Sequence, residues 1–328
     1  MAEKLAHLTS DVDIAYETFG DPAEDPLLLV MGLGGPMTWW APELCERLVD
    51  RGFFVIRFDN RDVGRSSRVP GPAPLSKKTL LRAYLGDSRY ATYTLDEMAG
   101  DAFGLLDELG IQSAHVTGTS MGGMIAQTMA IARPDRVTSL VSVMSTTGRR
   151  RVGWQDPRLF PMLLSPVART QQAYVERALR GWRAISSSVY PMPDEDITAR
   201  AIETWQRGYD PVGGARQTLA ILAQPDRSAE LERLRMPVAV VHGLADKLVH
   251  PSGGRATAAA VPAAELVLVP GMAHDIPPPL YDLFVDVLRR TADRAHPPLG
   301  ADSTDQPFAS SAGSAAANSD SVTSSSAR

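Results

Sequence analysis

Short apolar runs recur along the chain and predict buried strands. They are nearly continuous rather than alternating, which is typical of a parallel sheet that is covered on both faces. The six runs are Pro26–Gly32, Phe53–Asp59, Ala114–Gly118, Val137–Met144, Pro237–Gly243 and Ala264–Pro270.

Amphipathic helical patterns separate these runs. The clearest spans Leu95–Leu109, which begins with a capping box formed by Thr94 and Glu97. A second helix is predicted over Leu280–Arg290. Because strands and helices alternate, we expect an α/β fold in which a mostly parallel sheet carries helices on both faces.

The alternation fails between Met144 and Met236, where the sequence predicts no strand. Helical patterns joined by proline-rich turns occupy this stretch, so we expect a helical cap inserted between two strands of the sheet. Its three helical stretches are residues 156–166, 170–185 and 194–209. A shorter insert, Arg65–Tyr93, is rich in proline and basic residues, and we expect it to be irregular.

The composition changes at Pro297. From there onward the chain is almost wholly Ser, Ala, Gly, Asp and Pro, with too few large apolar residues to offset the entropy of folding. We therefore expect a disordered tail. The predicted organisation is a core made of residues 1–147 and 236–296, a cap at residues 148–235 and a tail at residues 297–328.

One serine lies at a corner between a predicted strand and a predicted helix. Gly118-Thr-Ser-Met-Gly122 ends the strand, and glycines on both sides of Ser120 relieve the crowding of a sharp turn. This is the nucleophile-elbow pattern, which presents the serine hydroxyl at the carboxyl edge of a sheet. The N-terminus of the following helix favours negative charge at the same place. A packing turn with an incidental serine is the simpler alternative.

A nucleophilic serine needs a base, and that base needs an orienting carboxylate. His274 directly follows the last predicted strand, in a loop at the correct edge of the sheet. Asp246 lies three residues beyond Gly243, where another strand ends. The order Ser120, Asp246, His274 is that of serine hydrolases with a nucleophile elbow. We predict these three as the catalytic residues.

The other histidines are weaker candidates for the base. His115 and His242 lie inside predicted strands, and His7 and His296 are near the ends of the chain. His250, four residues beyond the predicted acid, is the alternative base.

A tetrahedral intermediate needs backbone N–H donors for its oxyanion. Met121, the residue after the nucleophile, supplies one. The loop "VMGLGGPMTWW" after the first predicted strand fits the second, with Leu33 as donor. The glycines of this loop also resemble a dinucleotide-binding fingerprint, but Met37 replaces its third glycine and Pro36 interrupts it.

These motifs together resemble the α/β-hydrolase superfamily over residues 12–290. The resemblance rests on Gly-Thr-Ser-Met-Gly-Gly at the corner, "HGLADKLV" around the acid and "PGMAH" before the base. "FDNRDVGRSS" (Phe58–Ser67) matches another motif of the superfamily, with Asp62 where glycine is usual. That variant, with Met31-Gly32 in place of His-Gly, looks like an actinobacterial branch of lipases, esterases and polyketide methylesterases.

The resemblance implies hydrolysis of a carboxylic ester, with no cofactor and no metal. It also implies that Asp59 and Arg61 are structural loop residues. Thioesterases, carbon–carbon bond hydrolases and perhydrolases use the same triad and stay open as alternatives. A non-catalytic ligand receptor on a hydrolase scaffold is the alternative from another class, although no triad residue is lost.

The aromatic residues of the early loop and the cap suggest an apolar ligand. Trp39 and Trp40 follow the predicted oxyanion loop, and Trp154 lies in the predicted cap. We expect them to contact a small hydrophobic ester, although each could instead join the cap to the core.

Composition excludes several other partners. The net charge of −5 argues against nucleic acid and anionic membranes. No apolar run approaches the roughly 20 residues of a membrane span. The N-terminal segment has no signal-peptide core, and the single cysteine, Cys45, allows no internal disulfide. We expect a cytoplasmic protein of unspecified oligomeric state.

Overall fold

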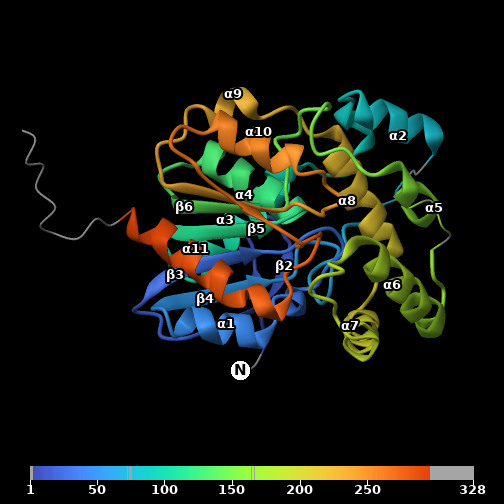
Figure 1. Cartoon of the computed structure of the whole chain (residues 1–328), viewed down its shortest axis with the longest axis horizontal. Coiled ribbons are helices and arrows are strands. Elements are labelled where there is room, and N and C mark those ends of the chain that lie inside the picture. Colours follow the sequence, from blue (N-terminus) through green and yellow to red (C-terminus); the bar gives the residue numbers. More distant parts are fainter. Residues whose placement is uncertain (1–2, 72, 74–75, 164, 166, 296–328) are drawn as a thin grey trace, which may run out of the picture. The chain divides into compact units, whose positions relative to one another are not determined.

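A mixed sheet runs through the body of the protein (Figure 1). The computed structural model describes residues 3–71, 73, 76–163, 165 and 167–295. Within them the strand order is β1-β2-β4-β3-β5-β6-β7-β8. The pairs β1–β2 and β2–β4 are antiparallel, and every other adjacent pair is parallel. The strands are β1 (Lys4–His7), β2 (Asp13–Phe19), β3 (Asp25–Val30), β4 (Phe53–Phe58), β5 (Ala114–Thr119), β6 (Val137–Val143), β7 (Val238–Gly243) and β8 (Glu265–Val269).

Alternate residues of the central strands pack on opposite faces of this sheet. In β3, Leu28 and Val30 join the core under α3 and α4, whereas Leu27 and Leu29 join the core under α1 and α11. Both faces are therefore covered, which explains why the strands read as continuous apolar runs. The covering helices are α1 (Pro42–Val49), α3 (Leu95–Glu108), α4 (Met121–Ala132), α10 (Ser252–Ala260) and α11 (Tyr281–Asp293).

The expected fold class is confirmed, and the six predicted strands correspond to β3 through β8. The prediction missed β1 and β2, which form the antiparallel edge of the sheet. The apolar pattern of β2 is interrupted by the polar residues Glu17 and Thr18, which are only partly buried. A search for continuous apolar runs passes over a strand of this kind.

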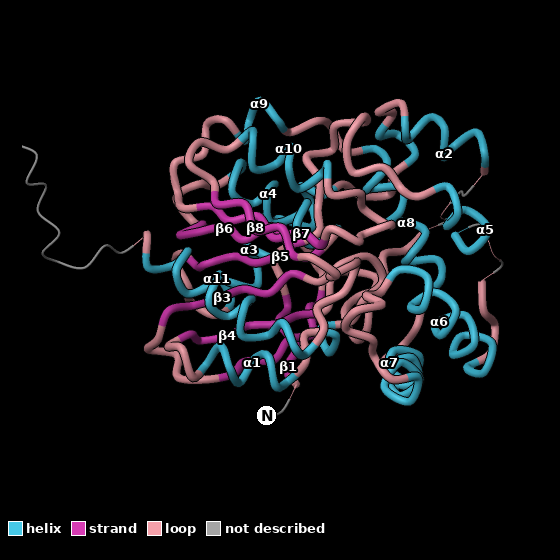
Figure 2. Tube along the Cα trace, in the orientation of Figure 1, coloured by secondary structure: helices cyan, strands magenta, loops and turns pink. Residues whose placement is uncertain are grey.

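Helices fill the chain between β6 and β7, and no strand interrupts them among the described residues. In Figures 1 and 2, α5, α6, α7 and α8 gather to the right of the sheet. We call residues 148–235 the insertion. That the insertion forms a separate cap stays a prediction. Its helices are α5 (Phe160–Leu163), α6 (Gln171–Ile185), α7 (Asp194–Gln206), α8 (Pro211–Ala223) and α9 (Ser228–Leu231).

The shorter insert at residues 65–93 is more regular than predicted. It contains α2 (Lys77–Tyr84), whose N-terminus is closed by a capping box between Ser76 and Thr79. This box was not predicted, because its sequence is Ser-x-x-Thr rather than the usual Ser-x-x-Glu. The predicted tail at residues 297–328 lies outside the described residues.

None of the helices in the described part of the chain has the length and apolar character needed to cross a membrane.

Buried ionic contacts fix the loop that follows β4. Arg61 forms two bonds to Asp101 of α3, Nε to Oδ2 at 2.5 Å and Nη2 to Oδ1 at 2.6 Å. Asp59 accepts the Met37 N–H at 2.6 Å and an N–H of Arg207 at 2.6 Å. These contacts support the structural roles expected for Asp59 and Arg61, since they join the loops at the carboxyl edge of the sheet.

Removing one member of the Arg61–Asp101 pair should destabilise the protein strongly. Burial already raises the pKa of Asp101 against the opposing effect of Arg61. In Arg61→Met the carboxylate stays buried without its partner, and we expect a loss of about 3–5 kcal/mol in unfolding free energy. The double variant Arg61→Met, Asp101→Leu should recover part of this loss. Urea unfolding measures both; equal stabilities for the single and double variants would contradict the account.

Candidate active site

The corner between β5 and α4 holds Ser120 in a strained conformation. Its φ is 54° and its ψ is −120°, a combination that residues with side chains rarely adopt. A Cβ on Gly118 would lie 2.1 Å from Gly122 O, and a Cβ on Gly122 would lie 2.1 Å from Val30 O. The glycines that flank Ser120 are therefore a steric requirement of the corner.

Neighbouring backbone holds the corner in place. The Ser120 N–H donates to Val143 O at 2.9 Å, and Ser145 Oγ donates to Ser120 O at 2.7 Å. Because α4 begins at Met121, the first amides of this helix have no acceptor within it and lie next to the serine. The corner therefore combines a fixed hydroxyl with donors suited to negative charge.

Asp246 and His274 meet beyond the carboxyl ends of β7 and β8. His274 Nδ1 lies 2.8 Å from Asp246 Oδ2. The other carboxylate oxygen accepts the backbone N–H groups of Leu248 and Val249, both at 2.9 Å. Because an ionised carboxylate can only accept, we assign the Nδ1 proton to His274, which leaves Nε2 free to accept another.

Two histidines keep the buried carboxylate ionised. Burial alone would raise the pKa of Asp246, but His274 and His242 together hold that pKa well below its usual range. His242 Nε2 lies 3.4 Å from Asp246 Oδ2 and 2.8 Å from Val249 O. His242 was predicted only as a strand residue, although its spacing of four from the predicted acid was a signal for this contact.

The loop that carries His274 is tied to the insertion. The His274 N–H donates to Ile185 O, at the end of α6, at 2.9 Å. The next residue, Asp275, accepts the Ser187 N–H at 3.0 Å, and Ser187 Oγ donates to Gly271 O at 2.7 Å. Burial raises the pKa of Asp275 to about 6. The insertion therefore helps to fix the position of the histidine.

Ser120 and His274 line one cavity of about 300 Å³. This volume is within the range of sites for small molecules. Among the described residues, no hydrogen bond joins the Ser120 hydroxyl to His274 in this structure. Such contacts often tighten only when substrate binds. Most of the lining side chains are apolar, including Met31, Leu33, Met144, Met162, Ile185 and Ile276.

The loop after β3 packs directly against Ser120. A Cβ on Gly32 would lie 3.2 Å from Ser120 Cβ, which is tighter than ordinary side-chain contacts. Leu33 follows and lines the cavity, and the next amide, Gly34 N–H, donates to Gln217 Oε1 at 2.8 Å. The position of this loop is compatible with the predicted binding of an oxyanion by the amides of Leu33 and Met121. That role stays a prediction.

The structure corrects two of the three tryptophans predicted to contact substrate. Trp39 lines the cavity. Trp40 is 2% exposed and is buried instead in the core near α1 and α11. Trp154 is 49% exposed and stacks on the ring of His250, with centroids 4.1 Å apart. Neither lines the cavity: Trp40 turns into the core, and Trp154 lies on the surface.

The chain belongs to the α/β-hydrolase family. A family model described as "alpha/beta hydrolase fold" matches residues 25–277. This match covers well over half of the chain and confirms the family resemblance drawn from the motifs.

The curated relatives include two named methylesterases. Rhodomycin D methylesterase DauP of Streptomyces sp. (strain C5) is 31% identical over 288 residues, covering 81% of this chain and 90% of DauP. Rhodomycin D methylesterase DnrP of Streptomyces peucetius is 29% identical, covering 82% of this chain and 92% of DnrP. These relatives agree with the esterase branch that the sequence resembles.

Among solved structures, the enol-lactonase from Burkholderia xenovorans LB400 is similar to this chain, with a TM-score of 0.69. Its sequence identity is 22%, and the match covers 88% of this chain and 99% of the enol-lactonase. At this identity the likeness supports the fold alone.

The two candidate bases should differ sharply in their effect on activity. His274 contacts Asp246 at the cavity, whereas His250 stacks on Trp154 and does not line it. We expect His274→Ala to lower kcat by about 10³-fold or more, because triad members act as a unit. His250→Ala should keep most of the wild-type activity. Ester hydrolysis by the two purified variants measures this difference, and the reverse order would overturn the assignment.

Proposed function

We propose that this chain is a serine hydrolase that cleaves carboxylic esters through an acyl-enzyme on Ser120. One observation carries the proposal: the strained serine and the Asp246–His274 pair converge on a single apolar cavity. Strain of this kind persists where the surrounding structure enforces it, and it clusters at catalytic sites.

The chemistry follows from the positions of these groups. His274 Nε2 takes the proton of the Ser120 hydroxyl as the oxygen attacks the ester carbonyl. The amides of Leu33 and Met121 stabilise the oxyanion that forms. His274 then protonates the departing alcohol, and a water activated by the same imidazole releases the acid. Asp246 keeps the imidazole in the correct tautomer and stabilises its charged form.

The substrate that we propose is a small hydrophobic ester, and we propose the cytoplasm as the place of action. The apolar lining of the cavity supports an apolar acyl group. The methylesterase names of DauP and DnrP support a small alcohol such as methanol as the leaving group. Thioesterases, carbon–carbon bond hydrolases and perhydrolases would use the same three residues, so acyl-CoA and vinylogous diketone substrates belong in the same assay panel.

The size of the cavity should limit the acyl chain. We expect p-nitrophenyl esters with up to about eight acyl carbons to be cleaved fastest, because each buried methylene adds about 0.8 kcal/mol only until the pocket is full. Initial rates from acetate to palmitate measure this profile. A maximum at palmitate, with a jump in rate at a lipid interface, would contradict it and indicate a lipase with a mobile lid.

The same assay needs a variant that removes the nucleophile. Ser120→Ala should lower kcat on the best ester by about 10³-fold or more. A matched control is Ser10→Ala, since Ser10 is exposed in a loop away from the cavity. Full activity in Ser120→Ala would refute the proposed acyl-enzyme.

A further inference from the structure

An arginine from the insertion contributes to the wall of the catalytic cavity. Arg200, on α7, lines the same cavity as Ser120 and His274. Its guanidinium lies 5.9 Å from the centroid of the Trp39 ring and 5.3 Å from that of the Trp182 ring. The two indole rings are themselves 5.4 Å apart at 59°. Arg200 thus packs beside both indole rings, in a lining that also holds Arg177 and Asp275 but is otherwise mainly apolar.

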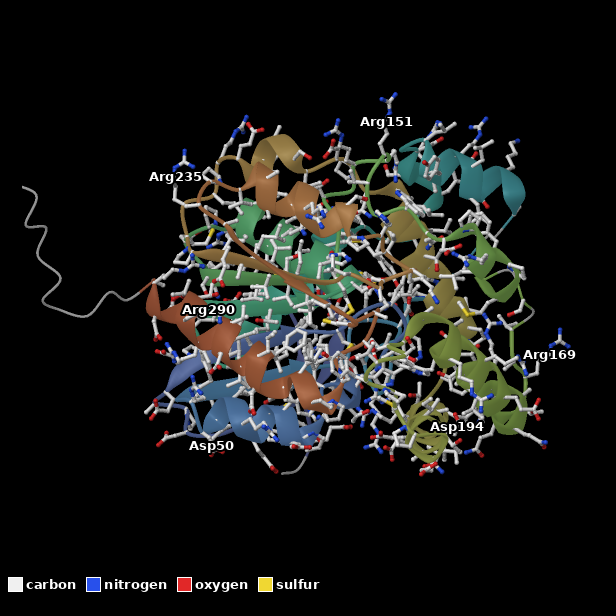
Figure 3. The ribbon with its side chains drawn as sticks, viewed as in Figure 1. Asp50, Arg151, Arg169, Asp194, Arg235 and Arg290 are labelled. Atoms are coloured by element: carbon white, nitrogen blue, oxygen red, sulfur yellow. The ribbon has the colours of Figure 1, made fainter. Side chains whose placement is uncertain are left out.

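The guanidinium of Arg200 has no acceptor. In the described part of the chain it forms no ion pair and donates no hydrogen bond, and it lies over the two aromatic rings. Exposed arginines such as Arg151 and Arg169 point away from the body of the protein (Figure 3). Solvent water can accept their hydrogen bonds.

Poorly exposed arginines elsewhere in this protein are paired. Arg61 meets Asp101, Arg216 meets Asp62 at 3.0 Å, and Arg207 meets Asp59 at 2.6 Å. Even Arg227, which has no carboxylate partner, donates to amide and carbonyl oxygens. Arg200 is only half-buried, and it differs from these arginines in having no acceptor among the described residues, at the cavity that holds Ser120 and His274.

Leaving this cation unpaired costs free energy. Burial lowers the pKa of Arg200, against the weaker opposing effects of Tyr281, Glu203 and Asp275, none of which forms an ion pair or hydrogen bond with it. A guanidinium stays protonated in proteins, so the cost cannot be avoided by losing a proton. Cation–π contacts offset part of it. An anionic oxygen in the cavity would supply the acceptor that the described part of the protein does not.

Asp275 does not fill this role. It lines the same cavity, but one of its oxygens accepts the Ser187 N–H and the other is buried without a hydrogen-bond partner. The protein thus places a carboxyl group nearby without using it to neutralise Arg200, which leaves the fork of guanidinium donors open to a ligand.

We propose, resting on the esterase function above, that Arg200 binds a carboxylate carried by the substrate at the end remote from the scissile ester. The substrate class is then a half-ester of a dicarboxylic acid, with an apolar chain between its two ends. A carboxylate is the acceptor that matches the planar guanidinium fork, with two parallel hydrogen bonds. One charged contact in an apolar cavity also fixes the direction in which the substrate enters.

The test compares two series of methyl esters that differ in one terminal group. Monomethyl succinate, glutarate, adipate, pimelate and suberate carry the carboxylate, and their terminal carboxamides are neutral analogues of the same shape. In the wild-type protein, kcat/KM for the best half-ester should exceed that of its carboxamide by about 10-fold or more. One chain length should be optimal. A ratio near one at every chain length would overturn the proposal without any variant.

Variants then assign the preference to Arg200. Arg200→Gln should lower kcat/KM for the best half-ester by about 10- to 100-fold and change the carboxamide by less than about threefold. Arg200→Lys, which keeps the charge but not the fork, should fall between them. The matched control is Arg180→Gln, because Arg180 is exposed on α6 and does not line the cavity.

The outcomes separate this inference from the proposed function. Equal losses on both series in Arg200→Gln would mean that Arg200 only packs the cavity, and would overturn the inference while leaving the esterase intact. Absence of Ser120-dependent hydrolysis in either series would instead refute the proposed function. If Arg200→Gln does not fold, the wild-type protein decides the question. Its inhibition constants for adipate and for the monocarboxamide of adipate are compared, and equal constants would overturn the inference.

Discussion

The strained corner at Ser120 is the constraint on which the site depends. A serine with positive φ persists only because the surrounding backbone allows no relaxation, and the close approaches at Gly118 and Gly122 leave no room for side chains. The same corner starts α4, so the hydroxyl and the free amides of the helix share one place at the edge of the sheet. Moving the serine would require the sheet and α4 to separate.

The groups that we propose for proton transfer are positioned near that corner by the two strands that follow the insertion. β7 and β8 end in the loops of Asp246 and His274, so their parallel pairing brings these two side chains together. The insertion contacts this base through Ile185 and contributes Arg200 to the cavity wall. The proposed catalytic geometry and the proposed choice of substrate would thus be linked, because α6 and α7 of the same insertion serve both. In the apolar cavity, a hydrogen bond or a contact between charges is stronger than the same contact in water.

Local motifs explain why so much could be predicted from the sequence. The corner at Ser120 is specified by its immediate neighbours, and the loops of Asp246 and His274 follow strands that are evident as apolar runs. What could not be predicted depends on contacts between distant segments. Trp39 and Trp40 are adjacent, yet one lines the cavity and the other is buried in the core. The lack of an acceptor for Arg200 could not be predicted from the sequence either, since pairing depends on which elements surround α7. β2 was missed because its partly exposed residues break the apolar run.

The most direct test of the account is the structure of the protein after reaction with a small alkyl phosphonate ester. Such a reagent forms a tetrahedral adduct that stands in for the intermediate of ester hydrolysis. The account predicts phosphorus bonded to Ser120 Oγ, with its oxygen within hydrogen-bond distance of the amides of Leu33 and Met121. His274 Nε2 should lie within hydrogen-bond distance of the serine or leaving-group oxygen. An adduct on another residue, or a phosphonyl oxygen that meets neither amide, would contradict it.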